Sequence, residues 1–110
     1  MKIKSEKIEG KIILRLDGRL DTSTSPILER EILQLMKADQ IHILVDFSGV
    51  DYLSSAGMRV LHSCMKKIKG LKGHLILFGL NEEPAKIIQL AGFHKILQIC
   101  STERDALQIH

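Results

Sequence analysis

The sequence predicts an α/β fold, a mixed sheet of about five strands with four helices in the order β-β-α-β-α-β-α-β-α. Two short segments, residues 41–47 and 74–78, are apolar enough to form strands buried on both faces of a sheet. Apolar residues recur at helical spacing before, between and after these two segments. Strands that alternate with helices imply parallel central strands. A length of 110 residues fits a single domain, residues 1–110.

The N-terminal residues predict a pair of strands. Residues 2–5 form a weak strand candidate, and Glu9-Gly10 is a turn signal. Residues 11–16 alternate between two sets of side chains, which is typical of a strand. We expect Asp17-Gly18 to end this second strand.

The first helix is expected after a cluster of capping residues at 22–25, with Pro26 in its first turn. It should run to about Lys37, because apolar residues recur at helical spacing over this stretch. These are Ile27, Leu28, Ile32, Leu35 and Met36.

The second helix is expected to start at Ser54-Ser55, after Leu53 closes a loop that follows the strand at 41–47. Gly70 and Gly73 bracket the turn out of this helix. Its buried stripe should consist of Met58, Leu61, Cys64 or Met65, and Ile68.

The last third of the chain predicts a strand at 74–78 and a third helix capped by Asn81, with Gly92 placed to follow its end. Residues 95–100 should form a short strand. Ser101 or Thr102 is expected to cap a final helix that runs through Ile109.

The composition argues against several classes of protein. The net charge is only +3, and the three Phe and one Tyr lie outside the densest lysine cluster, so base stacking beside it is not expected. We therefore expect no direct contact with nucleic acid, and interpret the cluster as a solvated helix end and turn. Its members are Lys66, Lys67, Lys69 and Lys72. No apolar run approaches the ~18 residues of a membrane span, and the N-terminus lacks the apolar segment of a secretory signal. The expected location is the cytoplasm, without membrane insertion.

The cysteines and histidines do not predict a metal site. Cys64 and Cys100 are expected to be buried free thiols. The five histidines do not pair with them at the spacing of metal ligands.

The sequence carries no recognisable catalytic motif. It has no G-x-S-x-G nucleophile elbow and no C-x-x-C pair. The glycines at 70 and 73 follow a helix and precede a strand, the reverse of the order in a phosphate-binding loop. The acidic residues are scattered over turns and strand ends, where they are expected to serve as turn and cap residues. We expect a protein that is not an enzyme and needs no cofactor.

The segment 51–61 (DYLSSAGMRVL) is the unusual feature. Gly57 lies in the first helical turn, where glycine costs about 1 kcal/mol relative to alanine. With Ala56 beside it, the helix start has few side-chain atoms, which suits close approach by another backbone or by an anion. A phosphate on a serine would be tolerated there and would add about −1.5 to −2 charges. The competing interpretation is that Ser54 and Ser55 serve only as an N-cap.

Together these features resemble the STAS domain, a family shared by sulphate transporters and anti-sigma factor antagonists. The resemblance covers nearly the whole chain and rests on residues 18–21 (GRLD), 44–46 (LVD) and 54–58 (SSAGM). In that family the acceptor serine is followed, one residue later, by glycine and a large apolar residue, a register that falls on Ser55. The family's acid before the first helix falls on Asp21. The antagonists usually carry an aspartate just before the acceptor serine, and this sequence has Ser54 there, which makes Ser54 a competing acceptor.

The resemblance implies a single STAS-like domain that acts as an anti-sigma factor antagonist. Such a protein binds an anti-sigma factor that is also a serine kinase, and thereby releases a sigma factor. Phosphorylation of Ser55 would switch it off, and a phosphatase would restore it. The alternatives are a STAS interaction subunit of a transporter or signalling scaffold without a phosphorylation switch, and an enzyme or nucleotide binder of another class.

The partner is expected to dock over the loops that follow the second and third strands, because such loops gather at one edge of an α/β sheet. Met58 and Ala56 are expected to give apolar contact, with Asp21 and Arg59 at the rim. The full set of expected partner-binding residues is Asp21, Thr22, Ser23, Ser54, Ser55, Ala56, Gly57, Met58 and Arg59.

Overall fold

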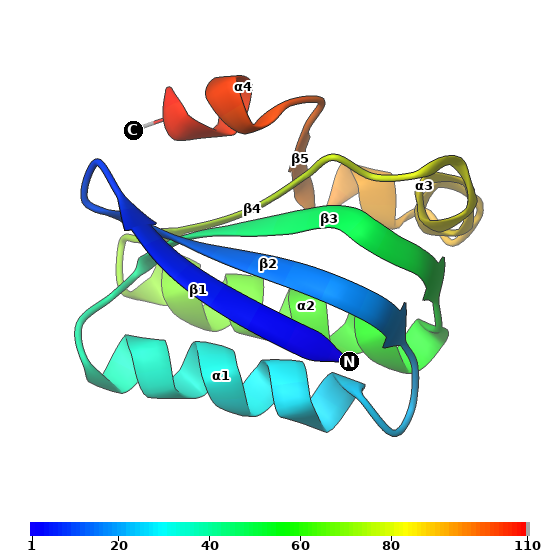
Figure 1. The fold of residues 1–110 in the computed structure, drawn as a ribbon, viewed down its shortest axis with the longest axis horizontal. Coiled ribbons are helices and arrows are strands. Elements are labelled where there is room, and N and C mark those ends of the chain that lie inside the picture. Colours follow the sequence, from blue (N-terminus) through cyan, green and yellow to red (C-terminus); the bar gives the residue numbers. More distant parts are fainter. Residues whose placement is uncertain (110) are drawn as a thin grey trace.

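A five-stranded sheet forms the centre of the molecule (Figure 1). The computed structural model describes residues 1–109, and His110, the last residue of the expected domain, lies outside the described residues. The strands lie in chain order across the sheet: β1 runs antiparallel to β2, and the other neighbours are parallel. They are β1 (Lys2–Ile8), β2 (Lys11–Leu20), β3 (His42–Leu53), β4 (His74–Phe78) and β5 (Gln98–Cys100).

The helices confirm the predicted order of elements. They are α1 (Ser25–Lys37), α2 (Ser55–Gly70), α3 (Glu82–Leu90) and α4 (Glu103–Leu107), with a short 3-10 turn η1 (Phe93–Lys95) before β5. Within residues 1–109, none of these helices combines the length and the apolar character needed to cross a bilayer.

Helices cover both faces of the sheet (Figure 1). The larger core lies under α1 and α2 and receives Ile88 from α3, while a smaller core lies under α4. Alternation along β2 divides the side chains between them, since Ile12 and Leu14 enter the larger core and Ile13 the smaller one. The predicted stripe of α2 is confirmed, with both Cys64 and Met65 buried.

Two central strands are longer than predicted. β2 continues through Asp17-Gly18 to Leu20, and β3 continues to Leu53 instead of ending near Phe47. The pairing between them shifts register on either side of Asp17-Gly18, and Gly18 has a φ of 125°. The turn residues therefore bend these strands at bulges and do not end them. A Cβ on Gly49 would lie 2.5 Å from the carbonyl oxygen of Leu16, so the irregular part of β3 needs glycine.

Smaller differences occur at the ends of the chain. β1 reaches Ile8 because Glu9-Gly10 forms a two-residue hairpin turn with positive φ at both positions, 54° and 79°. Only Gln98–Cys100 of the expected strand at 95–100 is extended, because η1 occupies its start. Gly92 has a left-handed φ and follows α3 as predicted.

Asn81 precedes α3 as predicted, but its side chain does not cap the helix. The Asn81 side-chain amide donates to the carbonyl oxygens of Ser48 (3.1 Å) and Val50 (2.9 Å). It therefore holds the start of α3 against the irregular part of β3.

The two cysteines differ in exposure. Cys64 is a buried free thiol as expected, and burial raises its pKa to about 11. Cys100 is free but only half-buried, because it lies on the edge strand β5.

The two edges of the sheet have different protection. β1 forms one edge and carries the exposed lysines Lys2, Lys4 and Lys7. β5 forms the other edge and is only three residues long. Short or lysine-bearing edge strands pair poorly with strands of other chains.

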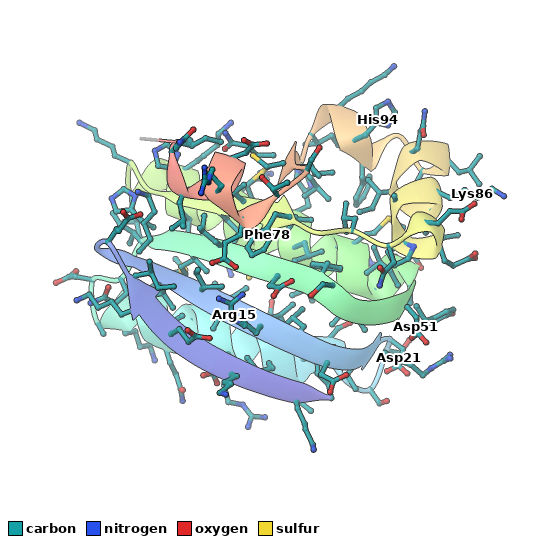
Figure 2. All side chains as sticks on the ribbon, turned by 45° about the horizontal axis from the view of Figure 1, so that its top comes forward. Arg15, Asp21, Asp51, Phe78, Lys86 and His94 are labelled. Atoms are coloured by element: carbon teal, nitrogen blue, oxygen red, sulfur yellow. The ribbon has the colours of Figure 1, made fainter. Side chains whose placement is uncertain are left out.

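Arg15 ties α4 to the sheet. It lies on the face of β2 that is turned away from α1 (Figure 2). Its guanidinium donates to Glu6 on β1 (2.7 Å), Asp46 on β3 (2.9 Å) and Glu103 on α4 (2.8 Å). Burial alone would raise the pKa of Asp46, but the backbone N–H of Ser48 and the Arg15 guanidinium outweigh it and lower that pKa. Hydrogen bonds from Arg15 also lower the pKa of Glu6.

We expect this network to make stability depend on pH in the acid range. Asp46 and Glu6 have depressed pKa values in the folded protein, so their contribution is present above about pH 5 and is lost as the pH falls through the folded values. Urea unfolding at pH 7 and at pH 3 should show this loss. Arg15→Met should cost about 1.5–3 kcal/mol at pH 7 and should flatten the pH dependence. An unchanged dependence in Arg15→Met would contradict this account.

Candidate functional site

Two loops leave the sheet side by side at the carboxyl ends of β2 and β3. Leu20, the last residue of β2, is paired in register with Leu53, the last residue of β3. The Ser54 N–H donates to the carbonyl oxygen of Leu20 (2.9 Å), which joins the start of one loop to the start of the other. In Figure 2 Asp21 and Asp51 lie together at this edge. The structure therefore brings together the two segments in which the expected binding residues lie.

Asp21 organises the loop between β2 and α1. Its carboxylate accepts from the Ser23 hydroxyl (2.9 Å) and from the backbone N–H groups of Ser23 and Thr24 (3.1 Å each). These bonds, that from the Ser23 hydroxyl foremost, lower the pKa of Asp21. Asp21 is therefore ionised at neutral pH and holds its own loop in shape, while Thr22 and Ser23 are exposed on it.

Arg19 and Tyr52 also lie at this edge, although the expected partner-binding set did not include them. The Arg19 guanidinium lies 4.1 Å from the centre of the Tyr52 ring, and its Nε lies 3.7 Å from the Asp21 carboxylate. Tyr52 is 39% exposed. Their contact depends on the register shift that pairs Arg19 with Tyr52, which no motif in the sequence reveals.

The two serines at the start of α2 have different environments. Ser54 is the N-cap, and its hydroxyl accepts from the backbone N–H of Gly57 (3.1 Å). Ser55 is the first residue of the helix; it is exposed, and its hydroxyl makes no hydrogen bond within residues 1–109. The N-cap interpretation therefore applies to Ser54 alone, and the Ser55 hydroxyl is accessible from solvent.

Gly57 and Met58 point into the protein, contrary to the expected surface contact by Met58. Met58 is 5% exposed and belongs to the larger core. A Cβ on Gly57 would lie 2.8 Å from Leu53 Cδ1 and 3.0 Å from Leu20 Cγ. Glycine at this position therefore lets α2 pack closely against the strand ends, and it does not leave room for a partner.

A groove runs between α1 and α2 and is lined by Ala56, the residue that follows Ser55 in the helix. It has a volume of about 340 Å³ and contains Thr22, Ala56 and Arg59 of the expected set. Its other lining residues, which lie outside the expected set, are Ser25, Pro26, Glu29, Val60 and Ser63. The surface at this edge is thus a groove lined by both polar and apolar groups, with the exposed Ser55 one residue from its lining, a geometry suited to binding another protein.

The same edge has no grouping that suggests a metal site. Across residues 1–109, no group of three or more His, Cys, Asp or Glu side chains is arranged so that it could hold a metal ion.

Comparison with known proteins finds similarity to one family and to relatives of one kind. The STAS domain family model matches residues 2–106. The chain is 29% identical to the anti-sigma-F factor antagonist RsfB of Mycobacterium tuberculosis over 101 residues, which are 89% of this chain and 80% of RsfB. It is 26% identical to the anti-sigma F factor antagonist of Paenibacillus polymyxa over 108 residues, 97% of this chain and 92% of that protein.

Solved structures share the fold. An anti-sigma factor antagonist from Mycobacterium paratuberculosis superposes with a TM-score of 0.87 at 24% identity, covering 96% of this chain and 90% of that chain. The phosphorylated form of the Bacillus cell fate determinant SpoIIAA superposes with a TM-score of 0.72 at 19% identity, covering 96% of both chains.

We expect the two serines to differ in their effect on stability. Ser54→Ala removes the cap of α2 and should lower the free energy of unfolding by about 1 kcal/mol. Ser55→Ala removes an exposed hydroxyl without a partner and should change it by less than about 0.5 kcal/mol. Urea unfolding of the two variants beside the unchanged protein measures both effects. A larger loss for Ser55→Ala would show that the capping assignment is wrong.

Proposed function

The chain belongs to the STAS domain family, and we propose that it acts as an anti-sigma factor antagonist controlled by phosphorylation of Ser55. It would bind an anti-sigma factor and thereby free a sigma factor. The observation that carries the proposal is the exposed Ser55 hydroxyl, which makes no hydrogen bond in the described chain and directly precedes Ala56 of the α1–α2 groove. The partner's class rests on the names of the relatives, which are anti-sigma factor antagonists.

The proposal includes two enzymatic activities that belong to partners. The anti-sigma factor would carry the serine kinase activity, and a separate phosphatase would return the chain to its binding form. Neither activity requires catalytic residues in this chain. SpoIIAA, which shares this fold, has been solved in a phosphorylated form, which supports a phosphorylated state for proteins of this architecture.

Ser55 is favoured over Ser54 as the acceptor on structural grounds. The Ser54 hydroxyl accepts a hydrogen bond from the N–H of Gly57, and phosphorylation of Ser54 would disturb this bond and uncap the helix. Ser55 can take a phosphate without breaking a hydrogen bond of the described chain. A phosphate at this first helical position would also face the positive end of the helix dipole, which favours it locally.

The switch would act at the surface without refolding the domain. The inner side of α2 is fixed by packing of Gly57 against Leu20 and Leu53, whereas Ser55 lies on the outer side. A phosphate there adds about −1.5 to −2 charges to the interface and must be desolvated when the partner binds. Binding is therefore weakened while the fold is retained.

We expect Ser55 to be the single acceptor and its phosphorylation to weaken binding. Each anti-sigma factor encoded in the source genome would be purified and incubated with this chain and Mg-ATP. Intact-mass measurement should show one added phosphate on the unchanged chain and on Ser54→Ala, and none on Ser55→Ala. Phosphorylation should weaken binding by about 2–4 kcal/mol, or roughly 30- to 1000-fold. Amide NMR spectra should change near Ser55 only.

Several outcomes would contradict this switch. Peptide mapping that places the phosphate on Ser54 or Ser63 would refute the choice of acceptor. Equal affinity of both forms would refute the switch, and binding without phosphorylation by any of these proteins would favour an interaction subunit of another assembly. Asp21→Ala should weaken binding by less than phosphorylation does. Asp21→Asn keeps an acceptor for the loop N–H groups, so it separates the charge of Asp21 from its role in loop shape.

We also expect the isolated chain to have no nucleotide hydrolase activity. The binding-module interpretation assigns all catalysis to the partners. Phosphate release from ATP or GTP by the purified chain should not exceed the buffer background. Hydrolysis that survives repurification and is lost on a single substitution in this chain would overturn the interpretation.

A further inference from the structure

The positive charge of the chain is concentrated on α2. This helix carries four cations and no Asp or Glu, so its charge of +4 exceeds the +3 of the whole chain. All four side chains are exposed, and none takes part in an ion pair within residues 1–109. They are Arg59, Lys66, Lys67 and Lys69.

Part of this charge is aligned with Ser55. Residues 55, 59, 62 and 66 follow one another at intervals of four, three and four, so they form one row along the helix. At a rise of 1.5 Å per residue, the row from Ser55 to Lys66 is about 16 Å long. Lys67 lies beside this row as the neighbour of Lys66, and we call Arg59, His62, Lys66 and Lys67 together the basic row.

The basic row borders a hollow that continues the α1–α2 groove. Its volume is about 400 Å³, and all four members of the row line it together with Ser63. Arg59 and Ser63 line both the hollow and the groove, so the two form one continuous surface, and its lining on α2 begins at Ala56, the residue after Ser55.

The needs of the helix do not account for all of this charge. Lys67 and Lys69 lie in the last turn, where cations favour the negative end of the helix dipole. Arg59 lies in the second turn, near the positive end, and the first turn has no acidic residue. A cation there is electrostatically unfavourable for the isolated helix, and an anionic group bound beside it would compensate.

We propose that the surface of the partner seated on α2 is acidic and extends from Ser55 to Lys67. The partner's identity rests on the proposed function, but its charge follows from the row and the hollow. Protein carboxylates fit this surface better than nucleic acid does, because base stacking needs a free aromatic ring. The centre of the Phe93 ring lies 5.8 Å from the centre of the His62 ring, so this ring is already in contact with the domain. The chain has no Trp. A phosphate on Ser55 would lie one helical turn from Arg59, where it would pair with that guanidinium and repel the same carboxylates.

Glu29 provides a control of opposite sign. It lines the α1–α2 groove from α1 and is the acidic side chain there. Its carboxylate would repel an acidic partner. Removing the charge should therefore strengthen binding, whereas removing lysines should weaken it.

The test measures association rates of the anti-sigma factor that binds in the assay above, over a series of salt concentrations. Lys66→Gln/Lys67→Gln should lower the association rate roughly tenfold at low salt and make its salt dependence shallower. Lys2→Gln/Lys7→Gln removes two exposed lysines from β1 and makes the same change in net charge, so it should leave the rate within about twofold. Glu29→Gln should raise the rate. Thermal melting checks that each variant is folded.

The outcomes separate this inference from the proposed function. Failure of every anti-sigma factor to bind the unchanged chain would refute the proposed function and the inference with it. Normal binding that Lys66→Gln/Lys67→Gln leaves unchanged would refute the acidic surface alone. Duplex DNA binding by the unchanged chain that disappears in Lys66→Gln/Lys67→Gln would show that the basic row binds nucleic acid, and would overturn the inference.

Discussion

The parallel register between β2 and β3 is the constraint on which the site depends. It ends with Leu20 opposite Leu53, and the bond from the Ser54 N–H to the Leu20 carbonyl extends it by one residue. Two loops that are more than thirty residues apart in the chain therefore start from one fixed point. The bulges at Asp17-Gly18 and Gly49 set how far each strand runs, and thus where the loops begin.

The second helix combines a structural side and a recognition side. Gly57 and Met58 pack against the strand ends, so the start of the helix is held rigidly on the sheet. Ser55 and Arg59 lie on the other side and touch little of the domain. Because Ser55 and Arg59 are exposed whereas Gly57 and Met58 are buried, we expect a chemical change on the outer side to leave the core packing intact. This separation is what allows a small domain to carry a reversible signal.

The order of elements was predictable because the helical period is strong over α1 and α2, and because β3 and β4 contain nearly continuous apolar runs. The lengths of β2 and β3 were not predictable, because Gly18 and Gly49, which resemble turn residues in the sequence, lie in bulges within these strands. The adjacency of the loops after β2 and β3 was predictable, because loops that leave the carboxyl ends of parallel strands gather at one edge of the sheet. The orientation of Met58 was already implied by its place in the buried stripe, and assigning it to the surface conflicted with that periodicity. The Arg19–Tyr52 contact and the residues that α1 adds to the groove depend on register and helix packing, which a single sequence does not specify.

The protected edges of the sheet determine how this domain can recognise another protein. β1 presents lysines along its free edge, and β5 offers three residues. Extending the sheet by a strand from another chain is therefore disfavoured at both ends. Recognition by main-chain pairing tolerates many sequences, because every backbone offers the same hydrogen bonds. A domain that closes this route must select its partners through side chains, and a single charged group on one of them can then decide whether a complex forms.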